Sequence, residues 1–326
     1  MVITEKVGLK DIIISVVVVV IFAIGMLLAL NSYNNEGEKR SATISEEGEK
    51  NPNHIETFVK LLAIDPVKGD ITARLEFIPH GDLTKEDGTL KHNVKFYINS
   101  ANGKQEHSFE KGKRMNPMDA VISMYDGLAT DYPFDRHSAS LELYFTTKAE
   151  KAKAHDNTEG AAANKPAEEP AADAPKPAPT EEAKQSAEDE EVPLAVDFFG
   201  SIAGFKIAAA KSKESDDSYV MIDMSISRSS TVLFFSGFVM ILMWGMTLAV
   251  LVMVLSIVLR GRKIELAMFS FIAALLFAFA ALRNSQPGIP PIGTYSDFIA
   301  FFWAEVILSL SLLTIIITWL LRPAAK

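Results

Sequence analysis

The side chains of this sequence that could carry out chemistry do not fall into a known catalytic pattern. The histidines lack the His-x-x-x-His and His-Glu-x-x-His spacings that place two imidazoles on one helix face for zinc. They are His54, His80, His92, His107, His137 and His155. The sequence also contains no nucleophile elbow, phosphate-binding loop or dinucleotide-binding fingerprint. We therefore expect no catalytic residue, no cofactor and no bound metal, and we predict a protein that is not an enzyme.

One acidic residue is unusual because of its surroundings. Glu305 lies within the apolar stretch 298–321, where a lone carboxylate would cost about 2–3 kcal/mol in a membrane. We expect it to be protonated or paired, with Arg283 as its first partner. Further candidate partners are Asn284, Ser236 and Trp303. One interpretation is an ion or proton pathway; the simpler one is a structural pair between helices, because a single acid without a chain of polar groups is not a relay.

A second candidate site is the turn Tyr132-Pro133-Phe134-Asp135, which is followed by Arg136. Proline fixes a turn ahead of a strand, and we expect Phe134 to anchor that turn in a core. Asp135 would accept bonds from backbone N–H groups or pair with Arg136. The turn is similar to the Phe-Pro-Phe-Asp loop of pentameric ligand-gated channels, which place a β-sandwich above membrane helices. That resemblance implies a mechanical contact between this loop and the membrane region.

A third candidate site is a loop rich in proline and glycine at residues 283–297. Its turn-forming residues are Pro287, Gly288, Pro290, Pro291 and Gly293. These residues restrict the backbone and supply turns, so the loop is expected to be a stiff cap that touches the rest of the extracytoplasmic region. The alternative interpretation is a connector that only prevents two helices from continuing.

The elements that must position these residues begin with long apolar stretches. A bilayer core is crossed by about 20 apolar residues in a helix. The sequence contains such stretches at 12–30, 232–259, 266–282 and 298–321. We predict four transmembrane helices, one N-terminal and three C-terminal, with the lipid bilayer as the first partner of the protein. Within 266–282, only Ser270 is polar, which argues against a pore lined by that helix.

The charges between these stretches predict their orientation. The turn after 232–259 contains Arg260, Arg262 and Lys263, and short loops rich in Lys and Arg stay cytoplasmic. The loop 283–297 is then extracytoplasmic, and the tail 322–326 is cytoplasmic.

The N-terminal stretch 12–30 predicts the same orientation independently. Residues 1–11 carry Lys6 and Lys10, and the apolar stretch is longer than the roughly 7–15 residues of a signal peptide. A good cleavage site does not follow it, so we predict a retained anchor. A single crossing then delivers residues 31–230 to the extracytoplasmic side. We predict a multi-pass protein of the plasma (inner) membrane with both termini in the cytoplasm.

Alternating apolar residues predict the fold of the extracytoplasmic region, because successive side chains of a strand face opposite ways. The alternating sets are Ile71, Ala73, Leu75 and Phe77; Val94, Phe96 and Ile98; Ala139, Leu141, Leu143 and Phe145; and Val220, Ile222, Met224 and Ile226. Short strands separated by turns favour an antiparallel β-sandwich at 55–230. With the four helices, the fold class is an α+β membrane protein.

Two polar segments complete the chain. Residues 31–54 are expected to form a stalk, and residues 149–191 an acidic Ala/Pro/Glu-rich insertion that is too poor in apolar side chains to fold. The insertion accounts for most of the formal net charge of −9. It could tether a basic partner, but the simpler interpretation is a tolerated insertion in a surface loop.

The order of anchor, β-rich domain and closing helices resembles the membrane proteins grouped as DUF4436. Two stretches carry the resemblance: 131–136, Asp-Tyr-Pro-Phe-Asp-Arg, and 282–294, which is followed by Asp297 and Glu305. The family is one of unknown function, so the resemblance implies this topology and no substrate, cofactor or catalytic residue.

Three classes of function stay open. The first is a non-enzymatic cell-envelope protein whose β-sandwich binds a protein or envelope ligand. The second is a channel- or transporter-like protein, which predicts a homo-oligomer. The third is an enzyme at the membrane interface, which requires acid and base groups that converge in space. Nucleic acid is not expected as a partner, because the basic residues are scattered and no aromatic residues alternate with them.

Overall fold

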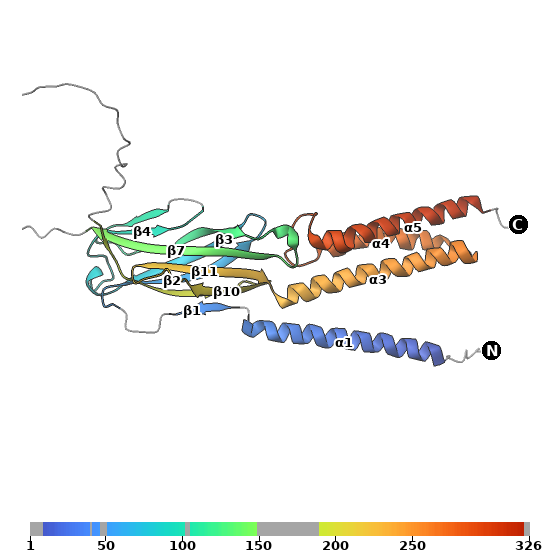
Figure 1. Ribbon diagram of the computed structural model, residues 1–326, viewed down its shortest axis with the longest axis horizontal. Helices are drawn as coiled ribbons and strands as arrows, with labels where there is room; N and C mark the ends of the chain where they lie inside the picture. Colours follow the sequence, from blue (N-terminus) through green and yellow to red (C-terminus); the bar gives the residue numbers. More distant parts are fainter. Residues whose placement is uncertain (1–8, 40, 46–50, 102–104, 149–188, 323–326) are drawn as a thin grey trace, which may run out of the picture.

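The computed structural model describes residues 9–39, 41–45, 51–101, 105–148 and 189–322. It is elongated, with a β domain at one end and a bundle of long helices at the other (Figure 1). The predictions for the extreme termini, for His155 and for residues 149–188 of the acidic insertion lie outside the described residues.

The β domain is a single sheet of eleven strands. The strands are β1 (Ala42–Ile44), β2 (Ile55–Asp65), β3 (Asp70–Pro79), β4 (Val94–Ile98), β5 (Glu106–Phe109), β6 (Met118–Asp126), β7 (Arg136–Lys148), β8 (Asp189–Glu191), β9 (Leu194–Gly200), β10 (Phe205–Lys211) and β11 (Tyr219–Arg228). Single turns of 3₁₀-helix lie at η1 (Gly81–Leu83) and η2 (Ala129–Asp131). The path through the sheet is β1-β9-β2-β3-β6-β7-β11-β10; β4 and β8 pair with β7, and β5 pairs with β4.

The sheet curves into a nearly closed domain because β6 pairs with β3 on one side and with β7 on the other. The first part of β6 pairs with β3 and its end pairs with β7, and β1 at one end of the path contacts β10 at the other. Almost all pairings are antiparallel, as expected, but the expectation of a purely antiparallel arrangement is wrong. β2 and β9 run parallel, from Ile55↔Leu194 to Lys60↔Phe199. A parallel pair requires a long connection, and the chain from β2 to β9 includes most of the domain.

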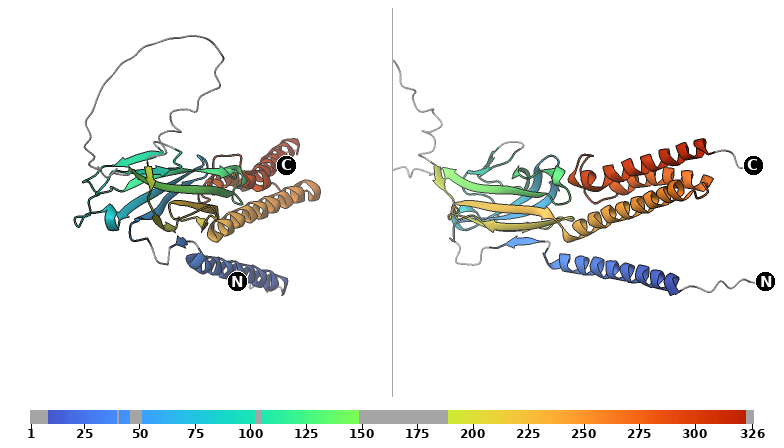
Figure 2. Two further views of the ribbon diagram at one scale, coloured as in Figure 1. Left: turned by 60° about the vertical axis from the view of Figure 1, so that its left-hand side comes forward. Right: turned by 45° about the vertical axis from the view of Figure 1, so that its right-hand side comes forward.

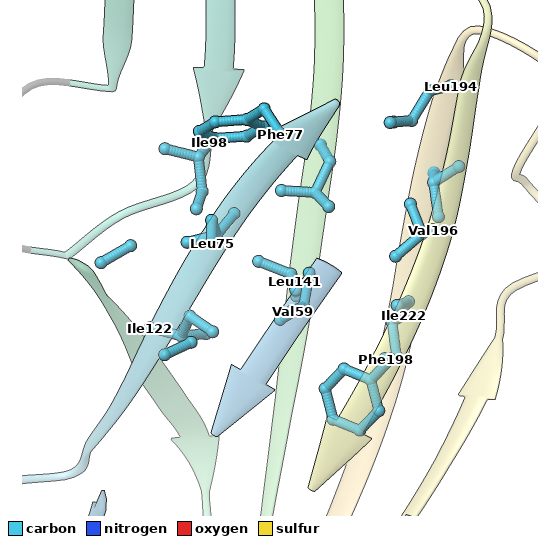
Figure 3. Close-up of a cluster of buried hydrophobic side chains, with 14 of the residues drawn as sticks. Val59, Leu75, Phe77, Ile98, Ile122, Leu141, Leu194, Val196, Phe198 and Ile222 are labelled. Carbon is cyan, nitrogen blue, oxygen red and sulfur yellow. The ribbon is translucent and has the colours of Figure 1, made fainter. Parts of the chain in front are cut away.

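The alternating residues of the sequence form the core of this domain. Leu75, Leu141 and Ile222 come from three strands and are fully buried or nearly so. Figure 3 shows them projecting into the same interior together with Val59, Phe77, Ile98, Ile122, Leu194, Val196 and Phe198. Since strands such as β3 and β11 bury every second side chain, their other side chains lie on the outer face of the sheet.

Three helices of the described chain are long and apolar enough to cross a membrane. They are α3 (Ser230–Arg260), α4 (Leu266–Asn284) and the segment Asp297–Leu321, in which the π-helical turn η3 (Asp297–Phe301) leads into α5 (Phe302–Leu321). β11 runs into α3 after Ser229 alone, so the sheet and the bundle are directly joined (Figures 1 and 2). The predicted C-terminal spans are therefore confirmed as apolar helices.

The N-terminal helix α1 (Leu9–Lys39) contains the predicted anchor and lies beside α3 (Figure 1). Its role as a crossing stays a prediction. The helix continues to Lys39, and β1 follows it, so the predicted polar stalk at 31–54 is in large part helix and strand. The acidic insertion also ends earlier than expected, since Asp189–Glu191 form β8 against β7.

Candidate functional site at the junction of the β domain and the helices

The turn Tyr132-Pro133-Phe134-Asp135 lies where the β domain meets the helices. It follows η2, and the Tyr132-Pro133 peptide bond is cis. Tyr132 is fully buried, whereas Phe134 is 56% exposed and forms an edge-to-face contact with the ring of Tyr295. The prediction that Phe134 anchors the turn in a core is wrong. Tyr132 is the anchor, because its larger polar-tipped ring reaches past the strands toward the helices.

Tyr132 joins three segments that are distant in sequence. Its hydroxyl lies 3.0 Å from the carbonyl oxygen of Pro287 in the Pro/Gly loop and 2.8 Å from Oγ of Ser236 on α3. A carbonyl can only accept, so the phenol donates to Pro287 and the Ser236 hydroxyl donates to the phenol. Burial raises the pKa of Tyr132, and the bond from Ser236 and the charge of Arg228 oppose that rise in part. The phenol therefore stays neutral.

Arg228, the last residue of β11, is the centre of the junction. Its guanidinium lies between two rings, 4.9 Å from the centroid of Tyr132 and 4.7 Å from that of Phe205. It is 4% exposed, and its Nε donates to both carboxylate oxygens of Asp135 at 2.9 and 3.0 Å. Aromatic rings and a carboxylate are the surroundings that a planar guanidinium favours.

Asp135 holds this arrangement from the side of β7. Its Oδ2 also accepts a bond from Nε2 of His137 at 3.0 Å, and both side chains are buried. The expected partner, Arg136, is exposed, so the prediction of an Asp135–Arg136 pair is wrong. Neighbouring residues of a strand face opposite ways, which places Arg136 on the outer face while Asp135 and His137 face inward.

A second buried ion pair closes the Pro/Gly loop. Arg283, at the end of α4, binds Asp297 of η3 through two bonds of 2.8 Å, Nε to Oδ1 and Nη2 to Oδ2. Asp297 also accepts bonds from the backbone N–H groups of Gly293 and Thr294. Nη2 of Arg283 donates in addition to the carbonyl of Pro290 at 3.0 Å. The charges of both side chains are thus compensated by several bonds, which a buried pair requires.

The prediction that Glu305 pairs with Arg283 is therefore wrong. Arg283 is engaged by Asp297, and Oε1 of Glu305 is buried without a hydrogen-bond partner among the described residues. The hydroxyl groups of Thr247 on α3 and Ser311 on α5 are also buried without a hydrogen-bond partner among the described residues. Asp297 competes successfully for Arg283 because it lies in the same loop and its geometry is bidentate.

The Pro/Gly loop contacts the β domain, so the interpretation of a cap is confirmed over that of a simple connector. Besides the bond from Tyr132 to Pro287, the N–H of Ser296 donates to the carbonyl of Tyr132 at 3.2 Å. Gly288 has φ +63°, and a Cβ there would lie 2.9 Å from Nη1 of Arg228. The loop therefore closes directly over Arg228 only because residue 288 is glycine. Of the two prolines singled out, Pro290 is buried and Pro291 is exposed.

The outer surface of the β domain has a groove of about 550 Å³ along β1, β2, β3 and β9. Two large apolar side chains are exposed in it, Phe58 (37%) and Phe199 (44%). Charged residues surround them: Lys60, Arg74, Glu76 and Asp197. Within the described residues, no group of three or more His, Cys, Asp or Glu side chains is placed to hold a metal ion.

The junction can hold the β domain in one orientation on the helices, because its buried bonds connect β7, β11, α3 and the Pro/Gly loop. Sequence reasoning found Tyr132, Asp135, Arg283 and the loop but missed Arg228, His137 and Ser236 as members. A signal for Arg228 was present: it continues the alternation of Met224 and Ile226, so it had to lie on the buried face of β11. A buried arginine implies a carboxylate partner.

Comparison with protein families divides the chain at about the same place. Residues 45–170 match the family model Domain of unknown function (DUF4436), and residues 228–322 match a second one, Domain of unknown function (DUF8686). The resemblance to DUF4436 is thus confirmed for residues 45–170. The stretch 282–294, which we had assigned to the same resemblance, lies in the DUF8686 match. None of the curated proteins matches the chain.

Proposed function

We propose that this chain is an integral membrane protein with four crossings whose β domain faces the extracytoplasmic side and binds a protein or envelope ligand without catalysing a reaction. Three apolar helices of spanning length support the membrane placement. The cations of the turn after α3, Arg260, Arg262 and Lys263, support the orientation.

The same proposal makes α1 the fourth crossing and a retained anchor. Its apolar side chains have few contacts within the chain: Val19 is 65% exposed and Leu27 is 66% exposed. Apolar surface of this extent is stabilised by lipid rather than by water. The topology that results puts β1 to β11 on one side of the membrane together with the Pro/Gly loop.

The groove along β1, β2, β3 and β9 is the observation that carries the binding role. In the parallel pair, Phe58 lies opposite Asp197 and Lys60 lies opposite Phe199, so aromatic and charged side chains alternate on the outer face. Exposed aromatic residues with a polar surround are characteristic of surfaces that bind other macromolecules. The buried junction below the domain keeps this groove at a fixed orientation relative to the membrane.

The test is crosslinking in cells with the full-length protein. A photoreactive residue at position 58 or 199 is expected to capture a partner, whereas the same residue at the exposed Tyr125 is expected to capture much less. Capture that is equal at all three positions would argue against the groove. Capture of only a second copy of the chain would replace the envelope ligand with a homo-oligomer.

The topology is tested separately by labelling introduced cysteines, since the natural chain has none. Cysteines at positions 101 and 289 are expected to react with an impermeant reagent in whole cells, and one at position 261 is expected to stay unreactive. The reverse pattern would overturn the proposed orientation.

A second candidate function, a proton or ion pathway, is favoured by Oε1 of Glu305 and the hydroxyl groups of Thr247 and Ser311, which are buried without hydrogen-bond partners among the residues that the structure describes. Polar groups without partners inside a membrane bundle are costly and mark pathways in many transporters. Flux through liposomes that is abolished by Glu305→Gln, with assembly intact, would favour this function over ligand binding.

A further inference from the structure

A second hollow, separate from the groove, lies where the strands reach the membrane. Its volume is about 440 Å³, and it is formed by β7, β11, β10 and the first turns of α3. The side chains considered below are Phe134, Asp135, Arg136, Lys206, Ser225, Ser227, Arg228 and Leu233, all of which line it.

The strand register places two cations on either side of a serine. Ser227 of β11 is paired with Arg136 of β7 on one side and with Lys206 of β10 on the other. Neighbouring strands lie about 4.8 Å apart, so Arg136 and Lys206 flank the serine hydroxyl on the outer face. Neither cation has an ionic or hydrogen-bonded partner within the part of the chain that the structure describes.

The next row of the same face is made of small side chains. Ser225 is paired with Ser138 on β7 and with Ala208 on β10. Three short side chains in a row leave room above the sheet that longer ones would fill. The two cations therefore border an open space, instead of lying on a flat surface.

Arg228 contributes further positive charge beside this hollow. It lines the hollow and is 4% exposed, and Nη2 has no hydrogen-bond partner among the described residues. Because Nη2 has almost no accessible surface, it does not contact a ligand in the hollow directly, but the positive charge of Arg228 adds to the potential there. Asp135 does not satisfy Nη2, because its oxygens receive Nε of Arg228 and Nε2 of His137.

We propose that this hollow binds a phosphate group, with Arg136 and Lys206 as its cationic ligands and the hydroxyl of Ser227 as a donor. Three cationic side chains and one acidic side chain, Asp135, line the hollow, so its lining has a net positive charge. The guanidinium group of an arginine also matches phosphate oxygens in geometry. The start of α3 adds the positive end of a helix dipole.

The phosphate can belong to a lipid headgroup or be free in solution. Leu233 on the first turns of α3 and the exposed Phe134 border the hollow on the side of the helices, which fits a lipid whose glycerol and chains continue along α3. The lipid source rests on the proposed crossing by α3, whereas binding of phosphate itself does not.

The test uses the purified full-length protein in detergent, with bound molecules counted by native mass spectrometry. The probes are short-chain phosphatidic acid, the matching diacylglycerol without phosphate, and inorganic phosphate. The variant is Arg136→Ala with Lys206→Ala, both exposed positions. The control is Lys85→Ala with Lys213→Ala, which removes the same charge from exposed positions outside both the hollow and the groove.

We expect phosphatidic acid to bind, diacylglycerol not to bind, and the variant to bind about tenfold more weakly than the control, because two charge-assisted bonds are lost. Competition by inorganic phosphate at similar concentration would assign the site to free phosphate; its absence would assign it to lipid. Equal binding by variant and control, or no binding of either phosphate compound, would overturn the proposal. Labelling of position 261 from outside would overturn the topology and leave phosphate binding standing.

Discussion

The interior of the β domain and its junction with the helices are both buried, but they are held by different forces. The interior is made of aliphatic and aromatic side chains such as Phe96, Leu141 and Ile222. The junction is made of ion pairs and hydrogen bonds, with Asp135–Arg228 and Arg283–Asp297 at its centre. An apolar core tolerates substitutions that change the shape of a side chain but not those that remove volume. A buried ion pair tolerates neither the loss of one charge nor a change in its geometry.

This difference indicates separate tasks. An apolar core stabilises the sheet whatever lies beside it, because the hydrophobic effect has no direction. Hydrogen-bonded ion pairs are directional, and they fix the angle at which the sheet meets α3 and the Pro/Gly loop. The junction is therefore expected to set orientation, and the core is expected to set stability.

The largest effect is expected from loss of volume in the core. Phe145→Ala removes a fully buried ring that contacts Phe77 and Phe96, and such changes cost about 3–5 kcal/mol. Phe134→Ala is the matched control, because that ring is 56% exposed, and it is expected to cost under about 1 kcal/mol. Denaturant unfolding in detergent, followed by circular dichroism, measures both. Similar losses for the two variants would contradict the assigned core.

The next effect is expected from loss of charge without loss of volume at the junction. Asp297→Asn keeps the shape of the side chain but leaves Arg283 buried with an uncompensated charge, at a cost of about 3 kcal/mol. Asp223→Asn, at an exposed position of β11, is the control and should change stability little. In the core, an equally conservative change such as Leu141→Met should cost under about 1.5 kcal/mol. An Asp297→Asn variant as stable as the control would remove the contrast between the two regions.

A double-mutant cycle tests whether Asp135 and Arg228 act as a unit. Asp135→Asn and Arg228→Met are each expected to destabilise, and the double variant is expected to lose less than the sum, with a coupling of about 1–3 kcal/mol. The physical reason is that the second change removes the charge that the first one left unpaired. The same unfolding measurement gives all terms. Additive losses would show that the 2.9 Å contact contributes no specific energy.

The sequence predicted the apolar core of the β domain better than the polar junction with the helices. Alternation predicted β3, β4, β7 and β11 and their part of the apolar core, since Leu75 or Leu141 needs only its own periodicity to be assigned. The three C-terminal helices followed from length and hydropathy. The curvature of the sheet and the parallel pair of β2 with β9 could not follow, because they depend on contacts between distant segments.

The candidate site was predicted by its parts but not by its pairs. Arg283, Tyr132 and Asp135 were singled out by their types and surroundings, yet Arg283 and Asp135 were given wrong partners and Tyr132 was given none. The choice between Glu305 and Asp297 for Arg283 depends on the path of the Pro/Gly loop, which brings Gly293 and Thr294 to the same carboxylate. Loop paths with several prolines and glycines have no periodic pattern from which to derive them.

The smallest effect is expected at the contact that joins the two regions. Tyr132→Phe keeps the buried ring and removes the hydroxyl that bonds Ser236 and Pro287, and loss of such bonds costs about 1–2 kcal/mol.

This variant also changes the dependence of stability on pH, which distinguishes it from a simple loss of packing. The folded state raises the pKa of Tyr132 above its ordinary value of 10.0 by burial. At a pH below this ordinary value, the phenol is protonated in both the folded and the unfolded state. Its contribution to the free energy of unfolding is then fully present. As the pH rises further, the unfolded state loses the proton first, so the free energy of unfolding falls until the pH passes the raised pKa. Tyr132→Phe is expected to make this fall shallower when unfolding is compared between about pH 9 and pH 11.

Part of the fall should persist in this variant, because burial raises the pKa of Tyr219 to about 12. Tyr219→Phe therefore serves as the companion variant. An unchanged slope in Tyr132→Phe would mean that its phenol is accessible to water, and the junction would then be open rather than closed around it.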